Sequence, residues 1–332
     1  MLERICTELG LGRMIALPAP LSGGYTHRMF RVETEKGAYA LKLLNPEIMQ
    51  RPDAMDNYRA AEEGEALLEA AGLPILPAKI IGGQKMQRVN GQYLYVFDYF
   101  DGRPLQDGEM TPAHCAKIGA ALAGIHAIDR RLPSQSPGGD SSSGGRAFWL
   151  TLAAGLLSSA DARAEGELLQ SAAPLLEKVT AAAEDAVRRL PKVQALCHND
   201  MDPKNVLWQG DDFRIIDLEC VGYANPLQEM LDLAISWGGG EEKHFKAFAE
   251  AYMAAGGVKI NDAAAVYDSR RNYIDWLAYN AKRALADEAQ EREIAREQIV
   301  MTVEKIRRDT EMRETILRWM EELPRPAPKP AP

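Results

Sequence analysis

The sequence predicts an α+β protein in two lobes, a small strand-rich lobe followed by a larger lobe that is mostly helical. Three observations lead to this prediction. Short β-rich segments and one helical pattern fill about the first hundred residues, and helical patterns dominate from Thr111 onward. The segment Asp101-Gly102-Arg103-Pro104 breaks the pattern between the two parts. We therefore expect an N-terminal lobe over 1–100, a C-terminal lobe over 101–323 and a disordered, Pro-rich tail over 324–332.

The N-terminal lobe is expected to consist of short strands around one helix. A glycine-rich loop, Leu21 to His27, precedes the first strand, and Thr34-Glu35-Lys36-Gly37 is typical of a hairpin turn. Residues 57–71 are rich in Ala, Glu and Leu and predict a helix that Gly72 and Pro74 end. The expected strands are 29–33, 38–44, 78–82 and 92–98.

The C-terminal lobe is expected to be a set of helices with one embedded strand-like pair. Thr111 and Pro112 are typical of a helix start, and the pattern continues to about residue 128. The Ser/Gly/Pro-rich stretch 133–146 predicts a flexible loop. The further expected helices are 148–158, 162–189, 226–237, 241–255, 262–286 and 289–322, and the strand-like pair is 193–197 with 213–218.

Composition excludes several classes of protein. A net charge of −9 argues against a nucleic-acid partner and is compatible with a cationic substrate. The 4 cysteines are scattered and form no CxxC pair, so neither a zinc site nor a redox dithiol is indicated. The N-terminus lacks the pattern of a signal peptide, and no apolar run is long enough to span a membrane. We expect a cytoplasmic protein without a membrane partner, and the sequence does not predict its oligomeric state.

The segment 196–207, LCHNDMDPKNVL, carries the strongest functional signal, HxDxxxxN, and the apolar strand 213–216 follows it and ends at Asp217. Phosphoryl transfer to an alcohol needs a carboxylate that takes the hydroxyl proton, and oxygen ligands for Mg²⁺. We therefore interpret Asp200 as the catalytic base and expect Asn205 and Asp217 to hold the metal. Each of these residues alone has a structural explanation, but the three together make that explanation improbable.

Other residues in and after this segment have more than one interpretation. His198 is interpreted as structural rather than chemical. Asp202 is either a solvated loop residue or a substrate contact, and Lys204 is either a phosphate contact or a surface lysine. Glu219 is a metal-site residue, an amine contact or a structural residue.

HNDMDPKNVL followed by IIDLE resembles the aminoglycoside phosphotransferase and choline kinase superfamily, and the resemblance covers about residues 20 to 320. It implies a two-lobed, protein-kinase-like fold with a small antiparallel-sheet N-lobe and a larger helical C-lobe. It also implies an ATP- and Mg²⁺-dependent phosphotransferase that acts on an alcohol group of a small molecule, with GTP left open as the nucleotide.

The resemblance also assigns nucleotide-binding residues in the N-terminal lobe. The loop before the first hairpin would cover the phosphates, although it lacks the fuller GxGxxG of protein kinases. Lys42 would contact the α- and β-phosphates with Glu63 as its partner, and Glu62 and Glu65 are alternatives. The backbone groups of Asp98 and Phe100 would pair with adenine beside Phe97. The loop residues assigned to the phosphates are Ser22, Gly23, Gly24 and Thr26.

The substrate stays open between several classes. An aminoglycoside or amino sugar, choline or ethanolamine, and an uncharged alcohol or metabolite such as homoserine all fit the motifs. The aromatic residues Trp237, Trp276 and Tyr279 would line a cation–π pocket or serve as packing. A nucleotide-binding pseudokinase or regulator is a rival of another class, although the motif residues are intact. A protein kinase is disfavoured because the chain lacks DFG and an APE-like segment.

Overall fold

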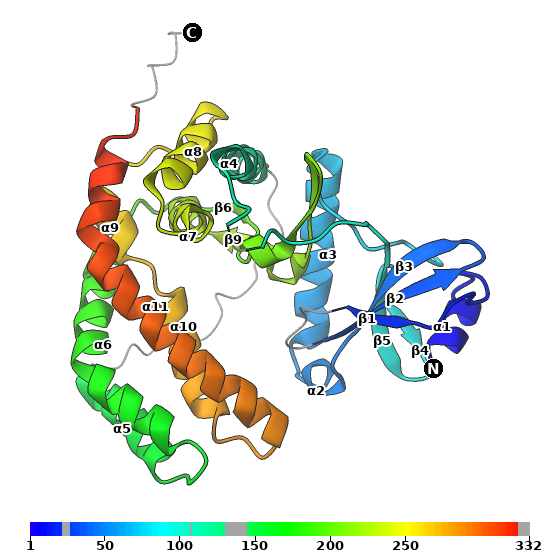
Figure 1. Ribbon diagram of the computed structural model, residues 1–332, viewed down its shortest axis with the longest axis horizontal. Coiled ribbons are helices and arrows are strands. Elements are labelled where there is room, and N and C mark those ends of the chain that lie inside the picture. The colour runs from blue at the N-terminus through cyan, green and yellow to red at the C-terminus, as the bar shows by residue number, and fades with distance from the viewer. Residues whose placement is uncertain (22–26, 107, 130–144, 325–332) are drawn as a thin grey trace.

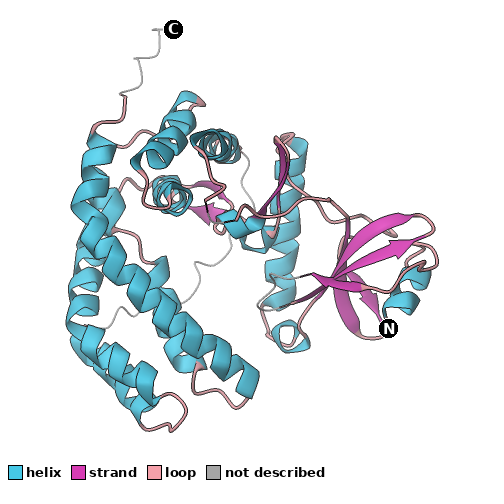
Figure 2. Cartoon of the chain, in the orientation of Figure 1, coloured by secondary structure: helices cyan, strands magenta, loops and turns pink. Residues whose placement is uncertain are grey.

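The computed structural model describes residues 1–21, 27–106, 108–129 and 145–324. Three predictions fall on other residues: most of the glycine-rich loop, including Ser22, Gly23, Gly24 and Thr26; most of the loop predicted at 133–146; and the tail 325–332. They lie outside the described residues. Within the described part, strands gather in one lobe and helices make up most of the other (Figure 2). The predicted fold class is thereby confirmed.

The small lobe is built on one antiparallel sheet with the strand order β1-β2-β3-β5-β4. Its strands are β1 (Ala19–Leu21), β2 (Arg28–Thr34), β3 (Gly37–Leu43), β4 (Gln87–Val89) and β5 (Gln92–Asp98). Helix α1 (Leu2–Glu8) packs Ile5 and Cys6 into a cluster with Val32, Leu41 and Val96 of the sheet. Short α2 (Pro46–Met49) and the long α3 (Ala54–Ala70) lie on the side of the larger lobe (Figure 1).

The large lobe has two cores. The first lies around α4 (Pro112–His126), α7 (Pro226–Gly238) and α8 (Glu242–Ala254), and it buries Trp237, Phe245 and Phe248. The second lies between α5 (Arg146–Leu157), α6 (Arg163–Arg189), α10 (Asn272–Arg283) and α11 (Ala289–Glu321). Short α9 (Ala263–Asp268) precedes α10. None of the helices in the described part is both long and apolar enough to cross a membrane.

Two small strand pairs lie between these helices and the small lobe (Figure 1). Strand β6 (Ala195–Cys197) pairs with β9 (Gly222–Ala224), and β7 (Val206–Gln209) pairs with β8 (Asp212–Ile215). The 3-10 turns Pro203–Asn205 and Leu218–Cys220 follow β6 and β8. The polar residues of both sequence motifs therefore lie on short connections between strands.

Three expectations about elements are wrong. Residues 78–82 form no strand: the Lys79 N–H donates to the Val96 carbonyl of β5 (2.7 Å), but the Ala78 N–H donates to a side chain, Glu65 Oε1 (2.9 Å). The strand at 193–197 pairs with β9 rather than with 213–218. The helix expected at 262–286 is interrupted at 269–271, where the Gln228 side chain of α7 donates to the Ser269 carbonyl (2.8 Å) and replaces its helical partner.

The close contact between α4 and α8 gives a stability prediction. A Cβ at Gly119 of α4 would collide with the Phe248 carbonyl oxygen of α8. Gly119→Ala is therefore expected to lower the free energy of unfolding by about 1–3 kcal/mol. The matched control is Gly155→Ala in α5, whose Cβ would lie 3.4 Å from the Leu285 side chain and would gain up to about 1 kcal/mol of helix propensity. Urea unfolding of both variants checks this, and equal midpoints would contradict it.

Candidate active site

The loop after β6 is held by the imidazole of His198, whose side chain is buried. The Asp200 backbone N–H donates to His198 Nδ1 (3.2 Å), so the ring hydrogen lies on Nε2 and is donated to the Ile216 carbonyl (3.2 Å). Asn199 has a left-handed backbone, φ 65°, which costs energy for a residue other than glycine and is typical of functional loops. His198 thus ties the two motif segments together, as the structural interpretation predicts.

Asp200 and Asn205 lie within hydrogen-bond distance. Asn205 Nδ2 donates to both the carbonyl oxygen and the Oδ2 of Asp200, at 2.7 and 2.8 Å. Lys204 Nζ lies 3.4 Å from Asp200 Oδ1. Burial raises the pKa of the Asp200 carboxyl above its ordinary value, and the charge of Lys204 partly offsets this rise. The arrangement leaves the Asn205 amide oxygen available as a ligand.

Lys42 of β3 meets the second motif across the boundary between the lobes. Its Nζ lies 2.7 Å from Asp217 Oδ1 and 2.7 Å from Glu219 Oε1. Burial alone would lower the pKa of Lys42, but the two carboxylates outweigh burial and raise it, so the amine is a cation. Asp217 has a left-handed backbone, φ 62°, directly after β8. The structure thus joins two residues that are 175 positions apart.

The expected pair between Lys42 and Glu63 does not form. Glu63 faces solvent on α3, and the two rival glutamates of this helix are occupied elsewhere. Glu65 pairs with Lys85 (2.6 Å), and Glu62 accepts from the Tyr95 hydroxyl (2.9 Å). None of these three carboxylates pairs with Lys42 in the described part of the chain, and Glu219 from the large lobe takes their place.

The segment after β5 has the backbone orientation that the hinge prediction needs. The Tyr99 N–H donates to the Ala38 carbonyl of the neighbouring β3 (3.0 Å). Backbone groups alternate along an extended chain, so those of Asp98 and Phe100 point away from β3. Strand β4 pairs with β5 only at residues 92–94 and does not reach this edge. The pairing of adenine with Asp98 and Phe100 beside Phe97 stays a prediction.

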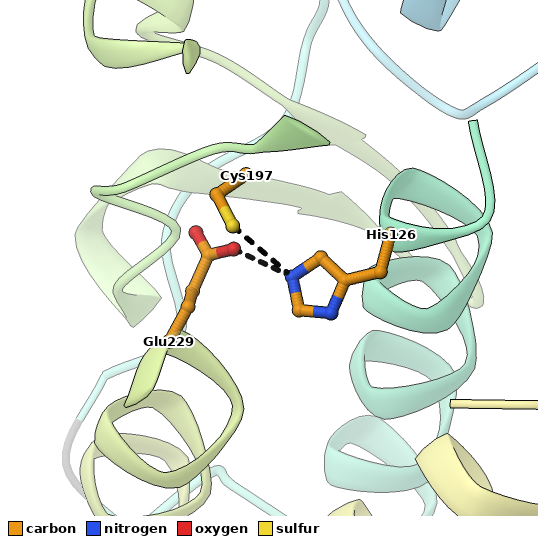
Figure 3. Close-up of side chains that lie close together, drawn as sticks. All are labelled: His126, Cys197 and Glu229. Atoms are coloured by element: carbon orange, nitrogen blue, oxygen red, sulfur yellow. Dashed lines mark hydrogen bonds and ion pairs between the residues drawn. The ribbon is translucent and has the colours of Figure 1, made fainter. Parts of the chain in front are cut away.

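A buried side-chain cluster supports the loop that carries Asp200. Glu229 of α7 accepts from the Asn199 backbone N–H through Oε1 (2.5 Å) and pairs through Oε2 with His126 Nε2 of α4 (2.7 Å) (Figure 3). Cys197 Sγ lies 3.6 Å from the same His126 nitrogen. These three ligand types lie within 4.8 Å of one another, but His126 Nε2 and Glu229 Oε2 already bond to each other, and Glu229 Oε1 accepts from the Asn199 backbone. The cluster is therefore a structural support beside Asp200.

The candidate substrate residues fall into separate places. Trp237 cannot contact a substrate, because it is fully buried and donates Nε1–H to the Met201 carbonyl (2.9 Å). Glu219 lies at Lys42 rather than on an open surface. Trp276 and Tyr279 of α10 are 41% and 43% exposed and stack with centroids 5.6 Å apart. Asp202 is partly exposed in the loop that carries Asp200. Tyr273, at the start of α10, has a pKa that is raised by burial and by the charges of Asp232 and Asp202.

Sequence reasoning missed four residues that the structure brings to this region. Glu229 carries a signal in retrospect, because it is an acidic residue among apolar positions of a buried helix. The other three have no local signal, because their partners come from distant segments. They are His27, Tyr58 and His126.

The comparisons with known proteins agree with this geometry. The family model described as "Phosphotransferase enzyme family" matches residues 19–273. No curated protein sequence matches the chain. A crystal structure of spectinomycin phosphotransferase with ADP and spectinomycin has a TM-score of 0.71 at 13% identity, and the match covers 92% of this chain and 97% of that one.

Two further solved structures are similar. The choline/ethanolamine kinase family protein from Mesorhizobium loti has a TM-score of 0.56 at 18% identity, with 92% of this chain and 93% of that one covered. The aminoglycoside phosphotransferase from Alicyclobacillus acidocaldarius has a TM-score of 0.58 at 19% identity, with 93% and 94% covered. At such identities the likeness concerns the fold alone.

Proposed function

The chain belongs to the phosphotransferase enzyme family, and from this premise we propose that it uses Mg²⁺ and ATP to phosphorylate a hydroxyl group of an amino sugar or aminoglycoside-like molecule. It is a small-molecule phosphotransferase. The observation that carries the finer proposal is the joint placement of Asp200 beside Asn205 and of Lys42 beside Asp217. A carboxylate base, oxygen ligands and a buried cation are the parts that phosphoryl transfer requires.

The proposed roles follow from the contacts of each residue. Asp200 accepts the proton of the substrate hydroxyl, whose oxygen forms a bond to the γ-phosphorus while the bond to the ADP oxygen breaks. Lys42, held cationic by its two carboxylate partners, binds the nucleotide phosphates. The backbone of Asp98 and Phe100 recognises the base beside Phe97. We also propose the lobe boundary near residue 100, where β5 ends at Asp98.

The donor set fits Mg²⁺. Asp217 offers a carboxylate, and Asn205 offers its amide oxygen because the amide nitrogen is engaged by Asp200. Hard oxygen ligands, few of them from protein, are what Mg²⁺ prefers. When bound, the ion neutralises charge on the phosphate oxygens.

The substrate class rests on two supports. The similar structures include enzymes whose names specify spectinomycin and aminoglycosides, and the acidic charge of the chain suits cationic acceptors. A choline or ethanolamine acceptor is the second candidate. The exposed stack of Trp276 and Tyr279 favours it, because aromatic faces attract quaternary and primary ammonium groups.

The raised pKa of Asp200 predicts an unusual acid limit of activity. The base works only when ionised, so kcat/KM should fall as the pH drops through the pKa of Asp200. Burial raises that pKa, so the fall should come at a higher pH than for an ordinary aspartate, whose pKa is about 3.9. Lys204→Met removes the opposing positive charge and should move the fall to still higher pH. If Lys204→Met has the same pH profile as the native chain, Lys204 does not lower the pKa of Asp200 and this prediction is wrong.

ADP release, coupled to an indicator reaction, tests the proposed function. The panel contains aminoglycosides, amino sugars, choline, ethanolamine and homoserine, each with and without Mg²⁺. We expect release that depends on Mg²⁺ and on an amino sugar or aminoglycoside. Release with choline alone would select the second candidate. Binding of Mg·ATP without any release would move the acceptor outside the panel, and absence of nucleotide binding would overturn the proposal.

A further inference from the structure

His27 is a buried histidine at the junction of both lobes, directly before β2. Its side chain is 4% exposed. Nδ1 accepts from the backbone N–H of Asn45 (3.0 Å). Nε2 lies 3.1 Å from the Tyr58 hydroxyl of α3 and 3.3 Å from Glu219 Oε2. The ring therefore contacts two other segments of the small lobe, at Asn45 and Tyr58, and the second motif of the large lobe.

These contacts fix the tautomer of the ring. A backbone N–H can only donate, so Nδ1 must present its lone pair to Asn45. The single ring hydrogen is then on Nε2, and the imidazole is neutral. The Tyr58 hydroxyl lies at hydrogen-bond distance from Nε2 (3.1 Å), and Glu219 Oε2 is a second acceptor 3.3 Å from the same nitrogen.

Glu219 contacts two residues of the small lobe, one with each carboxylate oxygen. Oε1 lies 2.7 Å from Lys42 Nζ, and Oε2 lies 3.3 Å from His27 Nε2. Lys42 has a second partner, Asp217, but the proposed function requires that carboxylate for the metal. The glutamates of α3 offer no replacement, because Glu62 and Glu65 are bound to Tyr95 and Lys85.

We propose that Glu219, oriented by His27, is the permanent ion-pair partner of Lys42 and leaves Asp217 free for Mg²⁺ when nucleotide binds. His27 is in this view a positioning residue that acts through Glu219. The inference rests on the proposed function, since it explains how Lys42 stays in place for the phosphates. It assigns to Glu219 the pairing with Lys42 that the sequence predicts for a glutamate on α3.

Two substitutions of His27 separate positioning from packing. His27→Gln puts an amide nitrogen near the place of Nε2 and keeps a donor for Glu219. His27→Asn puts an amide oxygen near the place of Nδ1 and keeps only the bond to Asn45. We expect His27→Asn to raise KM for Mg·ATP about tenfold or more, with KM for the acceptor unchanged, and His27→Gln to restore most of the affinity. Adding His27→Asn to Glu219→Gln should cost little beyond Glu219→Gln alone, because both act on one interaction.

Nucleotide affinity and thermal melting of the same variants give further readouts. Calorimetric titration with Mg·ADP follows the affinity without any acceptor. Equal loss in His27→Gln and His27→Asn, together with a matching fall in Tm, would overturn the proposal and leave a packing role. Unchanged affinity in both variants would overturn it as well.

The tautomer itself is measured by nitrogen NMR of the histidine rings in the full chain. We expect the His27 ring to carry its hydrogen on Nε2, because Nδ1 accepts from the Asn45 backbone N–H. We also expect its Nε2 signal to shift in Glu219→Gln. An Nδ1–H tautomer would overturn the inference. This result does not depend on turnover, so a failed kinase assay and a failed positioning role can be told apart.

Discussion

Asp200→Asn is expected to lower kcat by about 10²- to 10⁴-fold, the usual contribution of a general base. The amide has the shape of the carboxylate and can still accept the hydrogen bond from Asn205 through its oxygen. It cannot take the proton of an alcohol. Affinity for Mg·ATP should change only a few-fold, because Asn205, Asp217 and Lys42 remain. Turnover kinetics and nucleotide titration measure the two effects separately.

Asp202→Asn is the matched control for this result. Asp202 lies in the same loop and is also an aspartate, but the Asn205 side chain donates to Asp200 alone, and Asp202 accepts from Asn205 only through its backbone carbonyl (2.8 Å). A change in KM for the acceptor with nearly native kcat is expected. Comparable loss of kcat in both variants would mean that loop charge, rather than a base at Asp200, drives the rate.

Glu229→Gln is expected to lower the free energy of unfolding by about 3 kcal/mol and to lower kcat as well. The Glu229 carboxylate accepts two donors at once, the His126 ring and the Asn199 backbone. A glutamine has one oxygen for two donors, so its NH₂ group must face one of them in a buried site. The loop that carries Asp200 then loses its anchor. Chemical unfolding and turnover of the same preparation check both parts.

The acid stability of the native protein tests the same cluster. Burial alone would raise the pKa of Glu229, but the bonds from His126 and Asn199 outweigh it and lower the pKa. A carboxyl with a lowered folded-state pKa contributes its full stability above its unfolded value of about 4.3 and loses it as the pH falls through the folded value. In Glu229→Gln the free energy of unfolding should therefore fall less steeply as the pH drops below about 4.3. The control Glu242→Gln, at a surface pair with Lys246, should leave the acid limb of stability nearly unchanged. Equal effects of the two substitutions would contradict the anchoring role.

The catalytic loop could be predicted from sequence because its residues are close together in the chain. Asp200 and Asn205 are separated by one short turn, so their meeting depends only on local structure. The partner of Lys42 could not be predicted in this way. Its choice depends on the rotation of α3 and on a loop from the other lobe, and neither leaves a pattern near residue 42.

The errors in the element predictions have two different physical origins. The hairpin from β4 to β5 has a local signal, Asn90-Gly91, whose positive φ values of 49° and 83° suit a tight turn. The break in the helix at 269–271 depends on the side chain of Gln228 from another helix. Trp237 is a residue type that often lines cation–π pockets. Its complete burial and its hydrogen bond to the Met201 carbonyl show that it is a structural residue.

Detection of the phosphorylated acceptor tests the central claim most directly. The native chain and Asp200→Asn are each incubated with Mg·ATP and the acceptor panel, and phosphorus NMR distinguishes a phosphate ester from free phosphate. The native chain should form an ester in step with ADP, and Asp200→Asn should bind nucleotide and form almost none. Free phosphate without an ester for every acceptor, or an equal yield of ester from Asp200→Asn, would contradict phosphoryl transfer to an alcohol with Asp200 as its base.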